Sequence, residues 1–176
     1  MHDAPMIEFT NWVSAQTGGL TLIPRDKRAA LKAASTSIIG VVLWCLLLDL
    51  VVFKGALPSG IREFYTAPLW PRMLLFSGQA FAEELLYRLV LMTALVMVGV
   101  RLFGRLPVPW AVLSIVTAQL ACVLPVLIVA PIYTVFYYWL NGCVWGWLYW
   151  RHGWVTAAAA HCLIHLLLDP VLYWLL

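Results

Sequence analysis

Five apolar stretches account for most of the chain, and each is long enough to cross a lipid bilayer as a helix. They cover residues 33–53, 73–100, 110–130, 132–150 and 155–176. A spanning helix needs about 20 mostly apolar residues, because the hydrocarbon core is about 30 Å thick. The pattern therefore predicts an all-α, polytopic membrane helix bundle of about five transmembrane helices. Pro125 and Pro131 make the third and fourth stretches irregular and favour a broken helix pair joined by a tight turn.

The beginning of the chain differs from the rest. We divide the protein into an N-terminal segment, residues 1–32, which is cytoplasmic or interfacial, and a transmembrane bundle, residues 33–176. The early part of the segment mixes polar residues with four apolar ones: Ile7, Phe9, Trp12 and Val13. This mixture predicts a short interfacial helix that ends at Gly18 and Gly19.

The composition supports a membrane protein and excludes several other classes. Hydrophobic residues make up 64% of the chain and charged residues 11%, whereas soluble domains carry about 25% charged residues. This balance excludes a water-soluble globule and a nucleic-acid-binding module with a dominant basic face. We expect contact with membrane lipids and none with nucleic acid.

The basic residues predict the orientation. Seven fall on the N-terminal side of a five-span topology: Arg25, Lys27, Arg28, Lys32, Arg101, Arg105 and Arg151. Lys54, Arg62 and Arg72 fall on the other side. Because cytoplasmic loops carry the excess of Lys and Arg, the N-terminus is predicted to be cytoplasmic, with a bacterial inner membrane as the expected location.

Three charged side chains lie within two turns of the second span: Glu83, Glu84 and Arg88. An ionisable side chain at the centre of a spanning helix costs about 2.5–3.5 kcal/mol on insertion scales, so these residues need partners or water. Glu84 and Arg88 are four positions apart and are predicted to form an ion pair on one helix face. Glu83 points about 100° away from Glu84 and has no cation nearby in the sequence, which makes it a candidate functional carboxylate.

A second polar cluster lies in the last span. His161, His165 and Asp169 follow one another at intervals of four and stack along one stripe, which must face protein. If Pro71 marks the outer boundary, Glu83 lies about 12 Å from the inner boundary and His161 about 15 Å from it. The two clusters are then at similar depth, and we expect the acid and the imidazoles to meet.

These residues belong to a longer ordered pattern. Residues 83–88 read EExxxR, and further elements follow in order: Gly142-xxx-Gly146, Arg151, Gly153 and His161-xxx-His165. Over about residues 71–169 the pattern resembles the CPBP intramembrane proteases, which include CAAX prenyl endopeptidases and bacteriocin-processing proteins. The resemblance implies a CPBP-like core within the bundle. The paired glycines and the alanines at 157–160 are expected to bring the last span close to the second.

The resemblance implies roles for individual residues. The first glutamate of EExxxR, here Glu83, is implied to activate a water, and the final HxxxN motif to stabilise an oxyanion. An intervening FxxxH motif holds a histidine that positions the water, but this slot reads Ile-Val-Thr-Ala-Gln, so Gln119 stands in place of the histidine. His165 stands in place of the final asparagine. A glutamine can bond a water but cannot share its proton, so Glu83 would act alone as the base.

Two functions fit this pattern, and neither requires a cofactor. The first is a protease-derived scaffold that has lost catalysis and serves as a subunit or assembly factor of a larger membrane complex. The second is a peptidase that cleaves a lipidated or peptide substrate near the cytoplasmic boundary. In it Glu83 is the base, Gln119 orients the water, His161 and His165 stabilise the oxyanion, and Glu84 and Arg88 brace the site.

A third hypothesis is a metal site. Two histidines four positions apart suit zinc, and Asp169 and Glu83 are possible further ligands. The HExxH pattern of metalloproteases is missing from the sequence. The four cysteines also form no CxxC pair. The sequence therefore favours the other two hypotheses over a metal centre.

Overall fold

The computed structural model describes residues 4–54, 63 and 67–175, and within these ranges the secondary structure consists of helices without strands. Parts of two predictions lie outside the described residues. They are residues 1–3 of the predicted N-terminal segment and Arg62 of the predicted outer side. The prediction of an all-α helical membrane bundle is confirmed.

The first half of the chain forms three helical rods. Helix α1 covers Ala4–Thr17, and α2 covers Lys27–Leu47 and continues as the π-helix η1 over Leu48–Val52. The third rod is continuous from α4 (Leu69–Glu83) through the π-helix η2 (Glu84–Met92) to α5 (Thr93–Phe103). Helix α2 begins earlier than the apolar pattern predicts because the Asp26 side chain caps it, accepting from the amides of Arg28 and Ala29 at 2.9 and 3.0 Å.

The second half of the chain forms three further rods. Helix α6 covers Val108–Leu127, and a turn at residues 128–130 leads to α7 (Pro131–Tyr133), η3 (Thr134–Trp139) and α8 (Leu140–His152). Helix α9 covers Trp154–Leu175. The tight turn predicted between the third and fourth spans is therefore present, with Pro125 inside α6 and Pro131 in the first turn of α7.

Four helices of the described residues are long and apolar enough to cross a membrane: Lys27–Val52, Leu69–Phe103, Val108–Leu127 and Trp154–Leu175. The remaining predicted span, 132–150, is also helical, but its many tyrosines and tryptophans make it less apolar than the other four. Such amphipathic aromatic residues suit a helix that packs among protein neighbours and reaches the headgroups.

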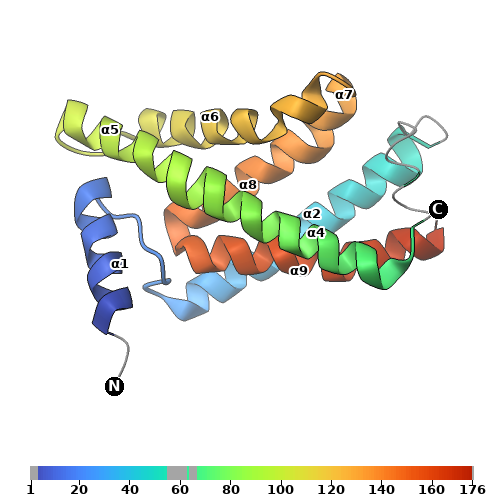
Figure 1. Ribbon diagram of the computed structural model, residues 1–176, viewed down its shortest axis with the longest axis horizontal. Helices are drawn as coiled ribbons and strands as arrows, with labels where there is room; N and C mark the ends of the chain where they lie inside the picture. The colour runs from blue at the N-terminus through green and yellow to red at the C-terminus, as the bar shows by residue number, and fades with distance from the viewer. Residues whose placement is uncertain (1–3, 55–62, 64–66, 176) are drawn as a thin grey trace.

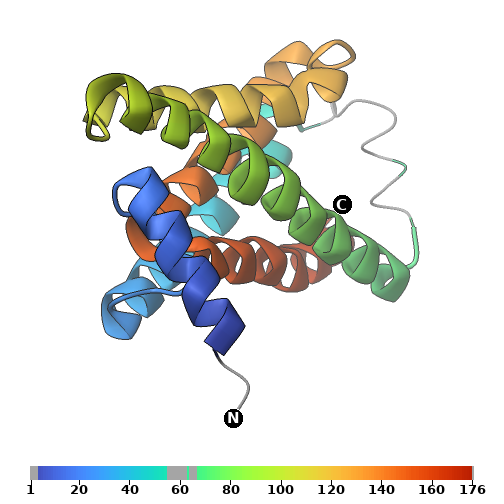
Figure 2. The ribbon, with the colours of Figure 1, turned by 60° about the vertical axis from the view of Figure 1, so that its left-hand side comes forward.

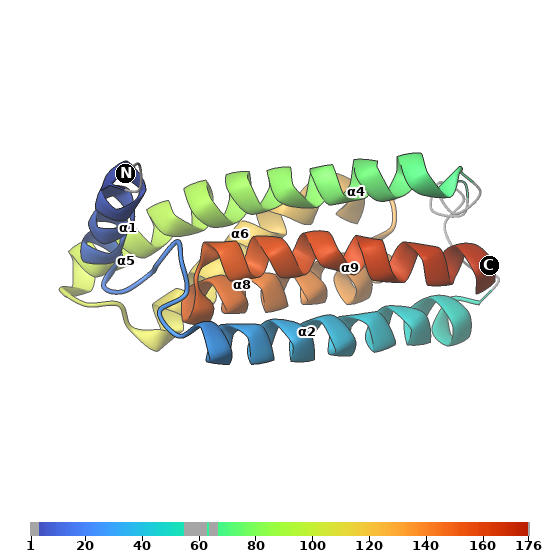
Figure 3. The same ribbon diagram turned by 90° about the horizontal axis from the view of Figure 1, so that it is seen from below.

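The long helices run side by side, and α9 lies among them (Figures 1 and 3). Helix α9 packs against α4, α2 and α8, while α6 packs against η2 and α8. The rod from Leu69 to Phe103 has 35 residues, about 52 Å of helix, which exceeds a hydrocarbon core of about 30 Å. Its α5 end extends past the start of α9 and contacts α1 (Figure 2). The fold thus places η2 and the middle of α9 next to each other in the interior.

Candidate functional site

The EExxxR motif lies where the long rod changes from α-helix to π-helix. Glu84 opens η2, and Arg88 lies in its middle. The amide of Thr93 donates to the Arg88 carbonyl, and the Thr93 hydroxyl donates to the same oxygen at 3.3 Å. The widened turns of π-helical segments recur at functional sites. Here the segment carries a buried acid and a buried base, with 0% of Glu84 and 2% of Arg88 exposed.

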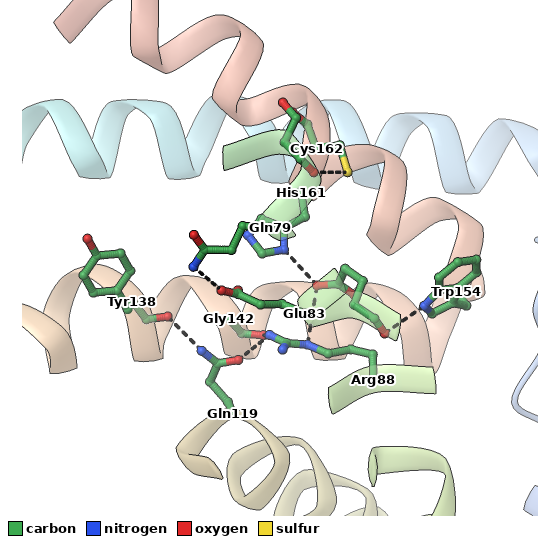
Figure 4. Close-up of polar contacts among 11 residues, drawn as sticks. Gln79, Glu83, Arg88, Gln119, Tyr138, Gly142, Trp154, His161 and Cys162 are labelled. Atoms are coloured by element: carbon green, nitrogen blue, oxygen red, sulfur yellow. Dashed lines mark hydrogen bonds and ion pairs between the residues drawn. The ribbon is translucent and has the colours of Figure 1, made fainter. Parts of the chain in front are cut away.

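Glu84 connects the third rod to the last helix. Its Oε1 atom lies 3.5 Å from Arg88 Nε, which confirms the predicted ion pair, and 3.0 Å from His161 Nδ1. Trp154 Nε1 donates to the Glu84 carbonyl at 3.0 Å (Figure 4). An acid of the second span and an imidazole of the last span therefore meet, but the acid is Glu84 and not Glu83, for which the contact was predicted.

Glu83 is placed differently from the prediction. Its Oε1 atom accepts a hydrogen bond from the neutral amide of Gln79, at 2.8 Å from Nε2, a partner that the sequence pattern does not predict (Figure 4). The side chain is half-buried, and the thiol of Cys122 lies next to it. Consecutive residues of a helix point about 100° apart, so when Glu84 faces His161 its neighbour faces another side.

Gln119 lies at the same site, on α6. Its Oε1 atom accepts a hydrogen bond from Arg88 Nη2, and its Nε2 atom donates to the Tyr138 carbonyl at 3.1 Å. Arg88 Nη2 also donates to the Gly142 carbonyl at 2.9 Å. Gln119 is 4% exposed, and both ends of its amide have protein partners. We call Glu84, Arg88, Gln119 and His161 the central network.

His165 faces a second group of polar side chains. Its Nδ1 atom lies 3.8 Å from Asp169 Oδ2, and its ring centroid lies 5.8 Å from that of His161. Arg72 Nη2 donates to the Asp169 carbonyl at 2.7 Å. The predicted stripe along α9 is confirmed, but His165 contacts Asp169 rather than Glu84. We call Arg72, His165 and Asp169 the distal network.

The small residues have a different role from the one predicted. A Cβ atom on Gly142 would overlap the Gln119 amide, and one on Gly146 would lie 2.7 Å from Ile115 Cγ2. Both glycines therefore admit side chains of α6, not the second span. The alanines of α9 behave closer to expectation, because Ala157, Ala158 and Ala160 are buried in the bundle.

Several residues of the site have no signal in the sequence pattern. Arg72 is predicted at the membrane boundary but is 2% exposed. Trp154 precedes the last apolar stretch in the sequence but bonds the Glu84 carbonyl. Trp145 stacks on the His161 ring with centroids 5.3 Å apart and planes at 20°. These contacts depend on how helices rotate against one another, which local spacing does not reveal.

Two surface grooves lie outside the central and distal networks. One groove of about 540 Å³ lies between α2 and α8 and includes Trp44 and Asn141, and another of about 320 Å³ lies beside Trp110. Neither is lined by a residue of the central or distal network. Within the part of the chain that the structure describes, no three His, Cys, Asp or Glu side chains come together as metal ligands, so the third hypothesis, a metal site, finds no support there.

A comparison with protein families agrees with this architecture. Residues 65–167, more than half of the chain, match the family described as type II CAAX prenyl endopeptidase Rce1-like. The chain therefore belongs to this family, and it is a CPBP-type membrane protein. No curated protein and no solved structure matches the chain.

Proposed function

We propose that this protein is a catalytically impaired, protease-derived subunit or assembly factor of a larger membrane complex. The observation that carries the proposal is the position of Gln119. This side chain stands where the resemblance implies a histidine, and it holds Arg88 on one side and the Tyr138 carbonyl on the other. An amide does not act as a general acid or base near neutral pH, so the residue serves the packing of helices here.

The neighbouring acids support the same conclusion. The Oε1 atom of Glu84 is held by His161 and Arg88, and Glu83 accepts from Gln79. A general acid or base accelerates a reaction by about 10²–10⁴-fold. The side chains of Glu83 and Glu84 are bonded to other residues, so they do not replace the missing histidine. A polar core of this kind stabilises a defined arrangement of helices without chemistry.

The surface of the bundle suits a partner in the membrane. Large apolar side chains are exposed along its helices, among them Trp70 at 72% and Trp174 at 80%. Tryptophan provides much contact area at low conformational cost and is enriched at protein interfaces. Lipid and a neighbouring membrane protein both match this surface.

The second candidate function, an intramembrane peptidase with Glu83 as general base, is favoured by one observation. Glu83 is half-buried, and the His161 side chain keeps 13% exposure next to Glu84. An acid and an imidazole at one site are the groups that activate water and stabilise an oxyanion. In this function Glu84 and Arg88 remain the structural brace.

Purification and cleavage assays distinguish the two functions. The full chain is purified through a tag in mild detergent and incubated with a prenylated peptide that carries a C-terminal CAAX sequence. We expect membrane proteins in fixed stoichiometry and no cleavage. The subunit proposal would be refuted if the protein purifies as a lone monomer and cleaves the peptide. The cleavage should then be lost in Glu83→Gln but not in the matched surface variant Glu8→Gln.

A further inference from the structure

The central and distal networks together form a line of ionisable side chains along α9. Asp169 Oδ2 lies 3.8 Å from His165 Nδ1, and the His165 and His161 ring centroids are 5.8 Å apart. His161 Nδ1 then lies 3.0 Å from Glu84 Oε1. From His161 to Asp169 the line rises about 12 Å along the helix axis. Glu84 and Asp169 are buried in the bundle, and the two imidazoles between them are partly buried.

The charges on this line and of Glu83 beside it do not balance without a proton. Three acids, Glu83, Glu84 and Asp169, are matched by two guanidinium groups, Arg72 and Arg88. Guanidinium keeps its proton in proteins, so the five groups carry one negative charge when all three acids are ionised. A net charge in a medium of low dielectric constant is unfavourable, and the group that is easiest to titrate takes up a proton instead. The two imidazoles and the acids are the sites open to it.

Other titratable and charged groups lie near the line on the helices around it. They are Arg72 and Glu83 on α4, Arg88 on η2, Cys122 on α6, Tyr138 on η3, Cys143 on α8, Asp49 on η1, and Cys162 and Tyr173 on α9. Thiols and phenols are neutral near pH 7. The mobile proton therefore belongs to the line itself.

Several polar atoms along the line are buried without a hydrogen-bond partner in the described part of the chain. They are Glu84 Oε2, His165 Nδ1 and Asp169 Oδ2. Buried polar atoms are nearly always satisfied, by protein or by ordered water. A water bonded to such atoms closes the gap between groups that lie too far apart for a direct hydrogen bond.

We propose that Asp169, His165, His161 and Glu84 form a proton relay between the end of the bundle where α9 finishes and the Glu84 carboxylate in its interior. A proton on Asp169 passes to one ring nitrogen of His165, and the other ring nitrogen releases a proton toward His161. His161 Nδ1 delivers its proton to Glu84 Oε1 while its Nε2 atom takes up the incoming one. Each imidazole thus gains and loses one proton.

The relay ends at Glu84, because the next groups neither accept nor release a proton near neutral pH. Arg88 stays protonated, and Gln119 is an amide. A fixed positive charge also repels a proton beyond this point. Chains of Asp, Glu and His within membrane helices are the groups that proton relays use. This function goes beyond the proposed subunit role and requires neither a peptidase nor a partner protein.

The test follows the His161 ring by NMR. The full chain, with ¹⁵N-labelled histidine, is placed in lipid nanodiscs, and the rate at which the His161 ring exchanges protons with solvent is measured from about pH 5 to about pH 8. His161 is assigned through the signal lost in His161→Gln. The relay predicts that the His161 ring of the wild type exchanges protons with solvent. It also predicts that this exchange is about 10²-fold slower in Asp169→Asn and in His165→Asn.

The control is Asp49→Asn, which removes a buried carboxylate that accepts a hydrogen bond from Tyr133 at 2.8 Å and is not a member of the line. Its His161 exchange rate is expected to equal that of the wild type. Three results would overturn the relay: no exchange of the wild-type His161 ring, unchanged rates in the folded variants, or an equal loss in Asp49→Asn. If the Asp169→Asn protein does not fold, the exchange rate in His165→Asn alone tests the relay, because this substitution keeps a polar side chain that cannot titrate.

Discussion

The central and distal networks lie one turn apart on α9 but are held in different ways. The central network joins five elements. From η2, Arg88 donates to Gln119 on α6 and to the Gly142 carbonyl on α8, and Glu84 contacts His161 on α9. Gln119 in turn donates to the Tyr138 carbonyl on η3. The distal contacts described above join only α4 and α9. The His165 side chain of the distal network is also more exposed than that of His161, at 26% against 13%.

One helix therefore holds polar residues in two ways, as a tightly bonded ion pair and as a looser pair. A fully buried ion pair with several hydrogen bonds fixes the rotation of the helices around it, and removing one partner leaves an uncompensated charge. A looser pair at 3.8 Å leaves room for protonation and for water. The following predictions break the central network first and then compare it with the distal one.

The largest effect is expected from Arg88→Leu. The change leaves Glu84 buried without its cation and leaves the Gln119 and Gly142 oxygens without their donor. We expect a loss of about 3–5 kcal/mol in the free energy of unfolding, measured by denaturant titration in detergent. The exposed Arg151 serves as the control, and Arg151→Gln should leave the midpoint unchanged. A stable Arg88→Leu protein with a wild-type midpoint would show that the central network does not stabilise the bundle.

The two histidines provide a matched comparison between the networks. His161→Asn removes a hydrogen bond to a buried carboxylate and a stacked contact with Trp145, so we expect a loss of about 2–3 kcal/mol. His165→Asn removes a contact longer than a hydrogen bond, and we expect a loss below about 1 kcal/mol. Thermal unfolding of both variants in the same detergent checks the order. Equal losses would contradict the distinction between the networks.

A smaller effect is expected at the contact of α8 with α6. Gly142→Ala places a methyl group against the Gln119 amide, which must move away from Arg88. Overpacking of this kind costs about 1–3 kcal/mol. Gly40→Ala is the control, because no atom lies within 4 Å of a Cβ atom at that position. If both variants unfold at the same midpoint, the close approach at Gly142 is not needed.

Local spacing was sufficient for part of this structure. The ion pair of Glu84 and Arg88 and the stripe from His161 to Asp169 follow from helix periodicity, since both involve residues four apart. The apolar stretches likewise predict the long helices.

The remaining features depend on the relative rotation of whole helices. Glu83 and Glu84 are chemically identical in the sequence, and only the packing of η2 against α9 selects the second of them as the partner of His161. The burial of Arg72 and the partners of Gln119 depend on the same packing. The π-helical geometry of residues 84–92 has no sequence signal that we recognise.

A double-mutant cycle tests most directly that Glu84, and not Glu83, is coupled to His161. The free energy of unfolding is measured for Glu84→Gln, Glu83→Gln, His161→Gln and the two double variants. We predict a coupling energy of about 1–3 kcal/mol between positions 84 and 161, and none beyond about 0.5 kcal/mol between 83 and 161. Coupling at position 83 with none at position 84 would contradict this arrangement of the site.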